Sequence, residues 1–198
     1  MMRVLIACEY SGTVRDAFLR KGHFAVSCDL MDSESDFGEH YKGDVEDILY
    51  DKWDLLIAHP PCTYMANSGV MWLHKDPKRW GKLDEAAKFF NLLLDAPIEK
   101  KCIENPIMHK YAKERIGLRK QSQVVQPWMF GHAEQKATCL WLRGLPKLTQ
   151  TCNVKEQMKT LSNRERQRLH YLSPSKDRWK LRSKTFSGIA KAMADQWG

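Results

Sequence analysis

Cys62 and Glu104 are the two side chains of this chain best suited to covalent chemistry. Each is expected on the first turn after an apolar strand, and prolines fix both turns, as Pro60-Pro61-Cys62 and Glu104-Asn105-Pro106. If the two strands are neighbours, the thiol and the carboxyl group face one crevice. A thiolate can add to an electron-poor ring carbon, while a carboxylic acid keeps the ring protonated. The alternatives are a buried thiol and a surface ion pair, and the proline-fixed turns favour chemistry.

Three acidic residues follow the first strands in chain order: Glu9, Asp29 and Asp44. In open α/β sheets, ligands bind outside the carboxyl ends of the strands. An acid at the end of the second strand can accept hydrogen bonds from a ribose diol, and one in the next loop can accept from an adenine amino group. The alternative is that each acid is a turn residue or a helix cap. The order of the three favours an adenosyl ligand.

The elements that would position these residues alternate along the chain. The first thirty residues are predicted to form a strand, a polar turn ending at Gly12, a helix and a second strand. This order of elements is typical of the start of a parallel doubly wound sheet. Residues 31–43 are polar and are expected to be irregular. We predict strands at 3–8, 24–28, 53–58, 101–104, 124–128 and 137–142, and helical segments within 14–19, 44–49, 72–94, 163–172 and 187–197. The predicted fold class is therefore α/β and Rossmann-like, with a mostly parallel sheet and helices on both faces.

The charge of the chain is concentrated in one segment. The 198 residues carry a net charge of +8, and residues 143–184 contain twelve Lys and Arg against three acidic residues. This basic segment, Arg143 to Lys184, indicates a polyanionic partner, and we expect nucleic acid. The alternative is a solvated basic face without a partner.

The six cysteines are scattered, with no C-x-x-C pair, so we expect reduced thiols in a cytosolic protein and no metal site. No apolar run is long enough to span a bilayer, so no membrane partner is expected.

Several motifs together carry a family resemblance. Pro60-Pro61-Cys62-Thr63-Tyr64 with Ser68-Gly69 resembles the proline-cysteine motif of cytosine-5 DNA methyltransferases, and Ile103-Glu104-Asn105-Pro106 resembles their Glu-Asn-Val motif. Residues 4–12, Asp29 and Asp44 match the positions of their cofactor loop and acids, and residues 182–186 with the closing helix resemble their C-terminal motif. The whole chain is similar to a group of short phage-type proteins of this family.

The resemblance implies an S-adenosylmethionine-dependent enzyme that methylates carbon 5 of cytosine in DNA through a covalent cysteine adduct. Cys62 would be the nucleophile, Glu104 would hold the base, Asn105 would fix the loop, and Lys136 would orient the base or stabilise the thiolate. It further implies a class I methyltransferase fold, a single domain over residues 1–198, and a cytoplasmic protein of a bacterial or phage-infected cell. The implied cofactor-binding residues are Cys8, Glu9, Tyr10, Ser11, Gly12, Asp29, Leu30, Asp44, Val45 and Pro60.

The chain departs from the family pattern on the substrate side. Thr63 stands where the family has glutamine, Lys136 is the only cation of the nearest match to the Gln-x-Arg-x-Arg motif, and the basic segment replaces the large target-recognition domain. Free pyrimidine nucleotides, single-stranded nucleic acid and amino methylation therefore remain alternatives, as does a degenerate fold that only binds nucleic acid. The target sequence and the oligomeric state are left open.

Overall fold

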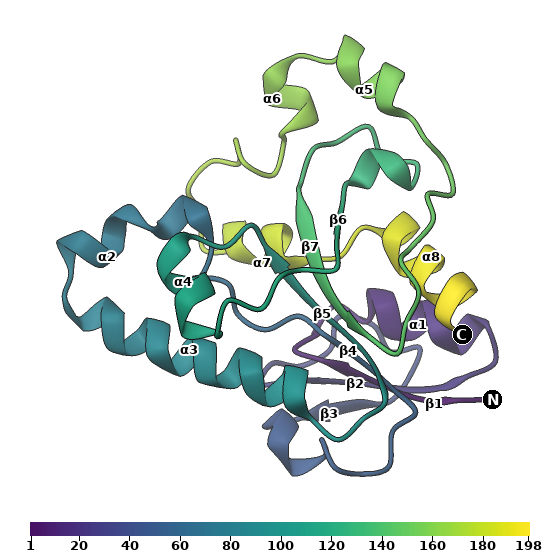
Figure 1. The fold of residues 1–198 in the computed structure, drawn as a ribbon. Helices are drawn as coiled ribbons and strands as arrows, with labels where there is room; N and C mark the ends of the chain where they lie inside the picture. The colour runs from purple at the N-terminus through teal and green to yellow at the C-terminus, as the bar shows by residue number, and fades with distance from the viewer.

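A computed structural model describes all residues, 1–198, and its centre is one seven-stranded sheet (Figure 1). The strands are β1 Arg3–Ala7, β2 Phe24–Asp29, β3 His40–Lys42, β4 Leu55–Ala58, β5 Lys100–Pro106, β6 Gln123–Val125 and β7 Thr138–Arg143. Their order is β3-β2-β1-β4-β5-β7-β6. The first five are mutually parallel, and β7 runs antiparallel to both β5 and β6. The prediction of a mostly parallel α/β sheet is confirmed.

Alternate residues of the central strands feed two separate cores, because successive side chains point to opposite faces of a sheet. In β1, Leu5 and Ala7 join one core and Val4 and Ile6 join the other, and all four are fully buried. The parallel strands are apolar on both faces for this reason.

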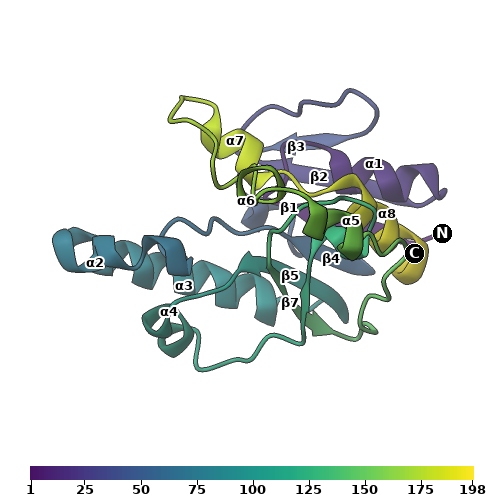
Figure 2. The ribbon, with the colours of Figure 1, turned by 90° about the horizontal axis from the view of Figure 1, so that it is seen from above.

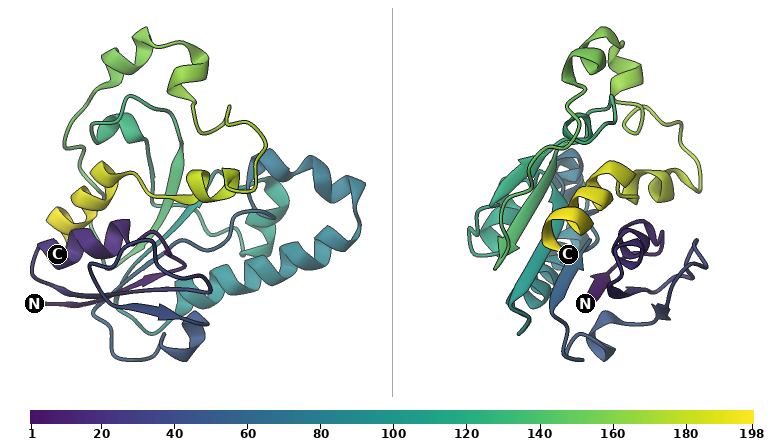
Figure 3. Two further views of the ribbon diagram at one scale, coloured as in Figure 1. Left: turned by 180° about the vertical axis from the view of Figure 1, so that it is seen from behind. Right: turned by 90° about the vertical axis from the view of Figure 1, so that its right-hand side faces the viewer.

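Helices cover both faces of the sheet (Figures 2 and 3). The helices α1 Thr13–Arg20 and α8 Ser187–Trp197 lie side by side over the Val4 face. The opposite face is covered by α2 Met71–Lys75, α3 Lys78–Asp95 and α4 Lys110–Arg115. The closing helix has the bounds predicted from the sequence.

The strand order reverses between β1 and β4, which is the topological switch point of this sheet. The chain leaves β1 toward β2 on one side, while β4 and then β5 lie on the other side. Crevices at such a point, outside the carboxyl ends of the strands, are where open α/β sheets bind ligands. The carboxyl ends of β1, β4 and β5 are therefore the expected place for a ligand.

Several local expectations are corrected by the structure. The strand predicted at 124–128 ends at Val125, because Pro127 begins a 3-10 turn. Residues 31–43 contain a strand, β3, which pairs with β2 at the exposed edge of the sheet. The strand β5 does not end at Glu104 but continues through Asn105 and Pro106, so Glu104 lies within the strand and not on the turn after it. Those last residues pair only with β7, since pairing with β4 stops at Ile103, and proline is tolerated where one side of a strand is free. The helix expected over 163–172 covers only Asn163–Arg166.

The basic segment connects β7 to the last helix through three short helices, α5 Lys155–Thr160, α6 Asn163–Arg166 and α7 Arg178–Ser183. Figures 1 and 3 show α5 and α6 projecting away from the sheet, whereas α7 returns across it. The remaining short elements are 3-10 turns: η1 Val45–Asp47, η2 Asn67–Gly69 and η3 Pro127–Met129. None of the helices has the length and apolar character needed to cross a membrane.

Candidate active site

Cys62 follows β4 and Glu104 lies in β5, and the two strands are neighbours, as the pairing of Ala58 with Ile103 shows. The carboxyl ends of these parallel strands therefore meet at one edge of the sheet. A buried hydrogen bond joins the two turns: Nδ2 of Asn105 donates to the carbonyl oxygen of Pro60 at 3.0 Å. Asn105 is 1% exposed, so the bond is shielded from water and fixes the position of the Pro60-Pro61 turn.

Cys62 begins a tight turn at this edge. Its carbonyl oxygen accepts from the backbone N–H groups of Met65 and Ala66, at 3.0 and 2.9 Å. The thiol is half-buried and free. Burial raises the pKa of the Cys62 thiol and the nearby carboxylate of Glu104 raises it further, whereas Lys136 and Arg182 act in the opposite direction. In this state the side chain is a thiol, and attack as a nucleophile requires loss of its proton.

The carboxylate of Glu104 is held by His59, a residue that the sequence did not mark as functional. Nδ1 of His59 lies 2.7 Å from Oε2 of Glu104, and the two side chains are only 10% and 13% exposed. Burial alone would raise the pKa of Glu104, but the hydrogen bond and charge of His59 outweigh burial and lower it. Burial would likewise lower the pKa of His59, and the contact with Glu104 raises it instead. The two residues therefore form an ion pair.

The first loop directs the side chain of Glu9 to the start of α1. Its carboxylate accepts from the backbone N–H groups of Val14 and Arg15, at 2.7 and 3.1 Å, and Ser11 donates to it at 3.3 Å. Burial raises the pKa of Glu9, and His59 and the two amides oppose that rise. Glu9 thus caps α1, which is the alternative that the sequence left open.

Two residues of the same loop adopt left-handed backbone angles. Cys8, directly after β1, has φ 57°, which is uncommon for a residue with a side chain. Gly12 has φ 70°, and a Cβ there would come within 2.7 Å of the buried Arg15 guanidinium. Gly12 is therefore required by the turn. Cys8 lies beside the ends of β2 and β4 because β1 pairs with both strands.

Asp29 and Asp44, the acids predicted to bind ribose and adenine, both lie near Cys8. Burial is the largest cause of the raised pKa of the Cys8 thiol, and the charges of the two acids raise this pKa further. Asp29 ends β2, and its Oδ1 accepts from the N–H of Met31 at 3.0 Å, which leaves Oδ2 free. Asp44 caps η1 through the N–H of Glu46. Of their neighbours, Leu30 is 74% exposed, whereas Val45 is buried in the core.

A small pocket of about 50 Å³ lies at the switch point, and the returning basic segment closes it. Its lining consists of Cys8, Glu9, Tyr10, Ser11 and His59 from the strand ends, with Ser183, Lys184 and Thr185. We call residues 178–186 the strap. Its position over the carboxyl ends of β1 and β4 leaves room for a few water molecules only.

Three side chains hold the strap in place. The hydroxyl of Tyr10 donates to the carbonyl oxygen of Lys180 at 2.7 Å and lies 3.0 Å from Oγ of Ser183. Nζ of Lys136 donates to the carbonyl oxygen of Arg182 at 2.8 Å. Lys184 forms an ion pair with Glu34. The ammonium group of Lys136 therefore binds the strap backbone, and Cys62 and Glu104 feel only its charge.

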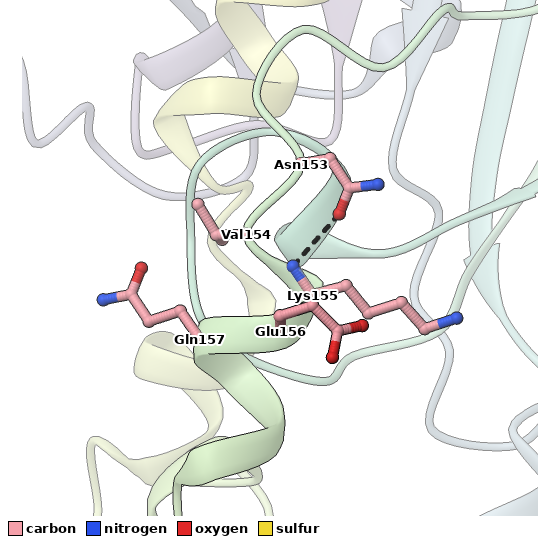
Figure 4. A pocket seen from close by; sticks show the side chains of 5 residues that line it. All are labelled: Asn153, Val154, Lys155, Glu156 and Gln157. Carbon is pink, nitrogen blue, oxygen red and sulfur yellow. Dashed lines mark hydrogen bonds between the residues drawn. The ribbon is translucent and has the colours of Figure 1, made fainter.

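A larger and open hollow of about 540 Å³ lies outside this site, around the start of α5 (Figure 4). Residues of a single turn line it: Asn153, Val154, Lys155, Glu156 and Gln157. The only bond drawn among them is from the N–H of Lys155 to Oδ1 of Asn153, a local turn contact at 3.0 Å. It holds no cluster of reactive groups, so the chemistry belongs at the strand ends.

Sequence comparison adds no family, because no family model and no curated protein match this chain. Solved structures that resemble it include the S. pombe Dnmt2 methyltransferase, at 15% identity and TM-score 0.43, covering 89% of this chain and 61% of that chain. A Spodoptera frugiperda DNMT2 mutant has 14% identity and TM-score 0.42, covering 75% and 53%. The bifunctional kinase-methyltransferase WbdD has 13% identity and TM-score 0.45, covering 75% and 36%. The chain spans between 36% and 61% of the length of these three structures.

Proposed function

We propose that this protein is an S-adenosylmethionine-dependent methyltransferase that acts on carbon 5 of cytosine in DNA, with Cys62 as the nucleophile. The observation that carries the proposal is the placement of Cys62 and Glu104 at the adjoining carboxyl ends of β4 and β5. Glu104 is bound to His59 through Oε2 alone, so Oε1 is left for a ligand. A thiol and a carboxyl group at one edge are what addition to a pyrimidine ring needs.

The chemistry of the strand ends suits the cofactor. Asp29 keeps Oδ2 for a ribose diol, Asp44 carries a second carboxylate nearby, and the exposed Leu30 offers an apolar surface for adenine. When bound, the cofactor supplies an electrophilic methyl group. The pocket beneath the strap, at about 50 Å³, is far smaller than this ligand, so binding requires Ser183 and its neighbours to move outward.

The residues of the chain would act on the base in the following way. The target base leaves its stack, because carbon 6 is unreachable inside a duplex. The Cys62 thiolate, once its proton has passed to solvent, adds to carbon 6, while Glu104 holds ring nitrogen 3 and the exocyclic amine. Carbon 5 becomes nucleophilic, accepts the methyl group and loses its proton, and Cys62 is expelled. Asn105 keeps the Pro60 carbonyl, and with it the cysteine turn, in register with Glu104.

The basic segment would hold the phosphates. Residues 143–184 carry twelve cations against three acids, and much of this charge lies on α5 to α7 outside the sheet. Contacts of this kind give affinity with steep salt dependence and little sequence information.

Trapping by 5-fluorocytosine tests the proposal. A carbon-5 fluorine cannot leave as a proton does, so an oligonucleotide with this base, incubated with the cofactor, should become covalently attached to the protein. Peptide mapping should find the adduct on Cys62. The Cys62→Ala variant should form none, whereas Cys152→Ala, which removes an exposed free thiol, should behave like the wild type. Production of 5-methylcytosine by Cys62→Ala would overturn the assignment.

The raised pKa of Cys62 and the small pocket favour a second candidate, a nucleic-acid-binding protein without transferase activity. Calorimetry separates the two: this candidate binds DNA but not S-adenosylmethionine. Assays with labelled cofactor on duplex DNA, single strands and free cytidine nucleotides then identify the substrate of an active enzyme.

A further inference from the structure

His59 lies between two carboxylates at the ends of three adjacent strands. Glu9 follows β1, His59 follows β4, and Glu104 lies in the last part of β5. The backbone N–H of His59 donates to the carbonyl oxygen of Ala7 at 2.9 Å, which locks the residue to the end of β1. This bond fixes the backbone of His59, and the contact of its ring with Glu104 fixes the ring.

The two ring nitrogens of His59 have different surroundings. Nδ1 contacts Oε2 of Glu104 at 2.7 Å. Nε2 is buried and has no hydrogen-bond partner, although His59 lines the small pocket under the strap. A buried polar atom without a partner is costly, and such atoms in native folds call for a specific explanation. The hydrogen bond between Nδ1 and Glu104 explains the unpartnered Nε2, because this bond holds the ring in the orientation that leaves Nε2 without a partner.

We propose that His59 is a positioning residue for Glu104 that also supplies the proton which Glu104 passes to ring nitrogen 3 of cytosine. This inference rests on the proposed function and adds a group that the resemblance to cytosine-5 methyltransferases did not identify. Glu104 uses Oε2 for His59 and presents Oε1 to the base.

In the addition step the bond from Sγ of Cys62 to carbon 6 forms. The π electron pair of the carbon 5–carbon 6 double bond moves to between carbons 4 and 5, and the π pair of the carbon 4–nitrogen 3 double bond moves onto nitrogen 3. The proton on Nδ1 of His59 first passes to the Glu104 carboxylate. The neutral carboxyl group then rotates to turn this proton toward nitrogen 3, and nitrogen 3 takes it. The imidazolium becomes neutral, the thiolate charge is consumed, and Glu104 ends as a carboxylate.

The charged groups that face His59 come from three elements. They are Glu104 on β5, Glu9 in the turn after β1, and Lys136 before β7. The two carboxylates favour the protonated ring and Lys136 disfavours it, with Glu104 in direct contact. Lys184 of the strap lines the same pocket and adds a positive charge when the strap is closed.

Exchange of the carbon-5 hydrogen tests this role without the cofactor. Addition of Cys62 makes carbon 5 take a proton from solvent, and elimination returns the base with the original hydrogen lost. The exchange rate on deuterated cytosine oligonucleotides is measured from pH 5 to 9 for the wild type, His59→Asn and the exposed His74→Asn. Asparagine at position 59 keeps a hydrogen-bond donor near the place of Nδ1, but its amide cannot transfer a proton to Glu104.

We expect His59→Asn to exchange about 100-fold more slowly than the wild type at pH 7.5, with its pH optimum moved toward acid. The shift arises because Glu104 must then take its proton from solvent, and carboxylic acids titrate below imidazoles. His74→Asn should keep the wild-type profile. A wild-type profile in His59→Asn would refute the role of His59 alone, whereas absence of exchange by the wild type would refute the proposed function.

Proton NMR of the imidazole gives a readout that needs no reaction. The pKa of His59 should fall in Glu104→Gln, because the charge that stabilises the imidazolium is removed. An unchanged His59 titration in that variant would overturn the coupling even in an active enzyme. Equal thermal unfolding midpoints of the variants exclude loss of the fold as the cause.

Discussion

Replacing Tyr10 with phenylalanine removes one of the three attachments of the strap and little else. The ring stays in place beside Trp179, with the centroids 6.0 Å apart. The lost hydroxyl bonded to the Lys180 carbonyl at 2.7 Å and to Oγ of Ser183 at 3.0 Å. Since Ser183 also donates to that carbonyl at 3.0 Å, the oxygen keeps a partner after the substitution. The net loss is therefore about 1 kcal/mol, which raises the open population of the strap about fivefold.

Hydrogen exchange measured by mass spectrometry detects this change. Amides of the strap peptide, residues 178–186, should exchange about fivefold faster in Tyr10→Phe, while those of β5 remain unchanged. The matched control is Tyr41→Phe, which also removes one hydroxyl, here on the edge strand β3 and bonded to Asp47 at 3.0 Å. Equal strap exchange in the wild type and Tyr10→Phe, or the same acceleration in Tyr41→Phe, would refute the attachment of the strap by Tyr10.

Three further outcomes follow from the structure. In Gly188→Ala the new Cβ would lie 1.9 Å from the carbonyl oxygen of Phe130, so calorimetry should show a melting temperature several degrees lower than that of the wild type. The control is Gly81→Ala, where the new Cβ meets open space, and this substitution should raise the free energy of unfolding by about 0.5–1 kcal/mol. The ion pair of His59 and Glu104 should stabilise the fold fully between the ordinary pKa values of 4.5 and 6.5. That contribution is lost as pH falls through the lowered pKa of Glu104 or rises through the raised pKa of His59, and denaturant titrations of the wild type and Glu104→Gln across pH measure it. The logarithm of the DNA association constant should fall linearly with the logarithm of the salt concentration. A shallow slope would argue against phosphate binding by the basic segment.

Much of the fold could be predicted from the sequence because its parallel strands are short apolar runs followed by turn residues. The run before Asp29 and the helical spacing in residues 187–197 each gave an element with nearly the observed bounds. The strand β3 was missed because its three residues are polar, and two of them are exposed at the sheet edge, so no alternation marks them. The length of β5 was missed because proline normally ends a strand, and only its one-sided pairing with β7 tolerates Pro106.

The site was predictable in its strand-end positions and not in its contacts. The neighbouring positions of Cys62 and Glu104 followed from their places after two strands. The contact of His59 with Glu104 could not follow, because it joins residues 45 positions apart through side-chain orientation alone. The placement of a histidine directly before Pro60-Pro61-Cys62 was the only signal. The bond from Lys136 to the strap spans 46 positions and was equally invisible in sequence.

The antiparallel direction of β7 has a consequence for the length of the chain that follows it. Because β7 begins beside the site and ends at the opposite edge of the sheet, the chain must travel back by one strand length before α8 can start. A six-residue strand covers about 20 Å, a span that about six extended residues bridge. Residues 144–186 greatly exceed that need, and longer connections add little closure entropy. The length of this stretch can therefore change by insertion and deletion while the sheet keeps its register.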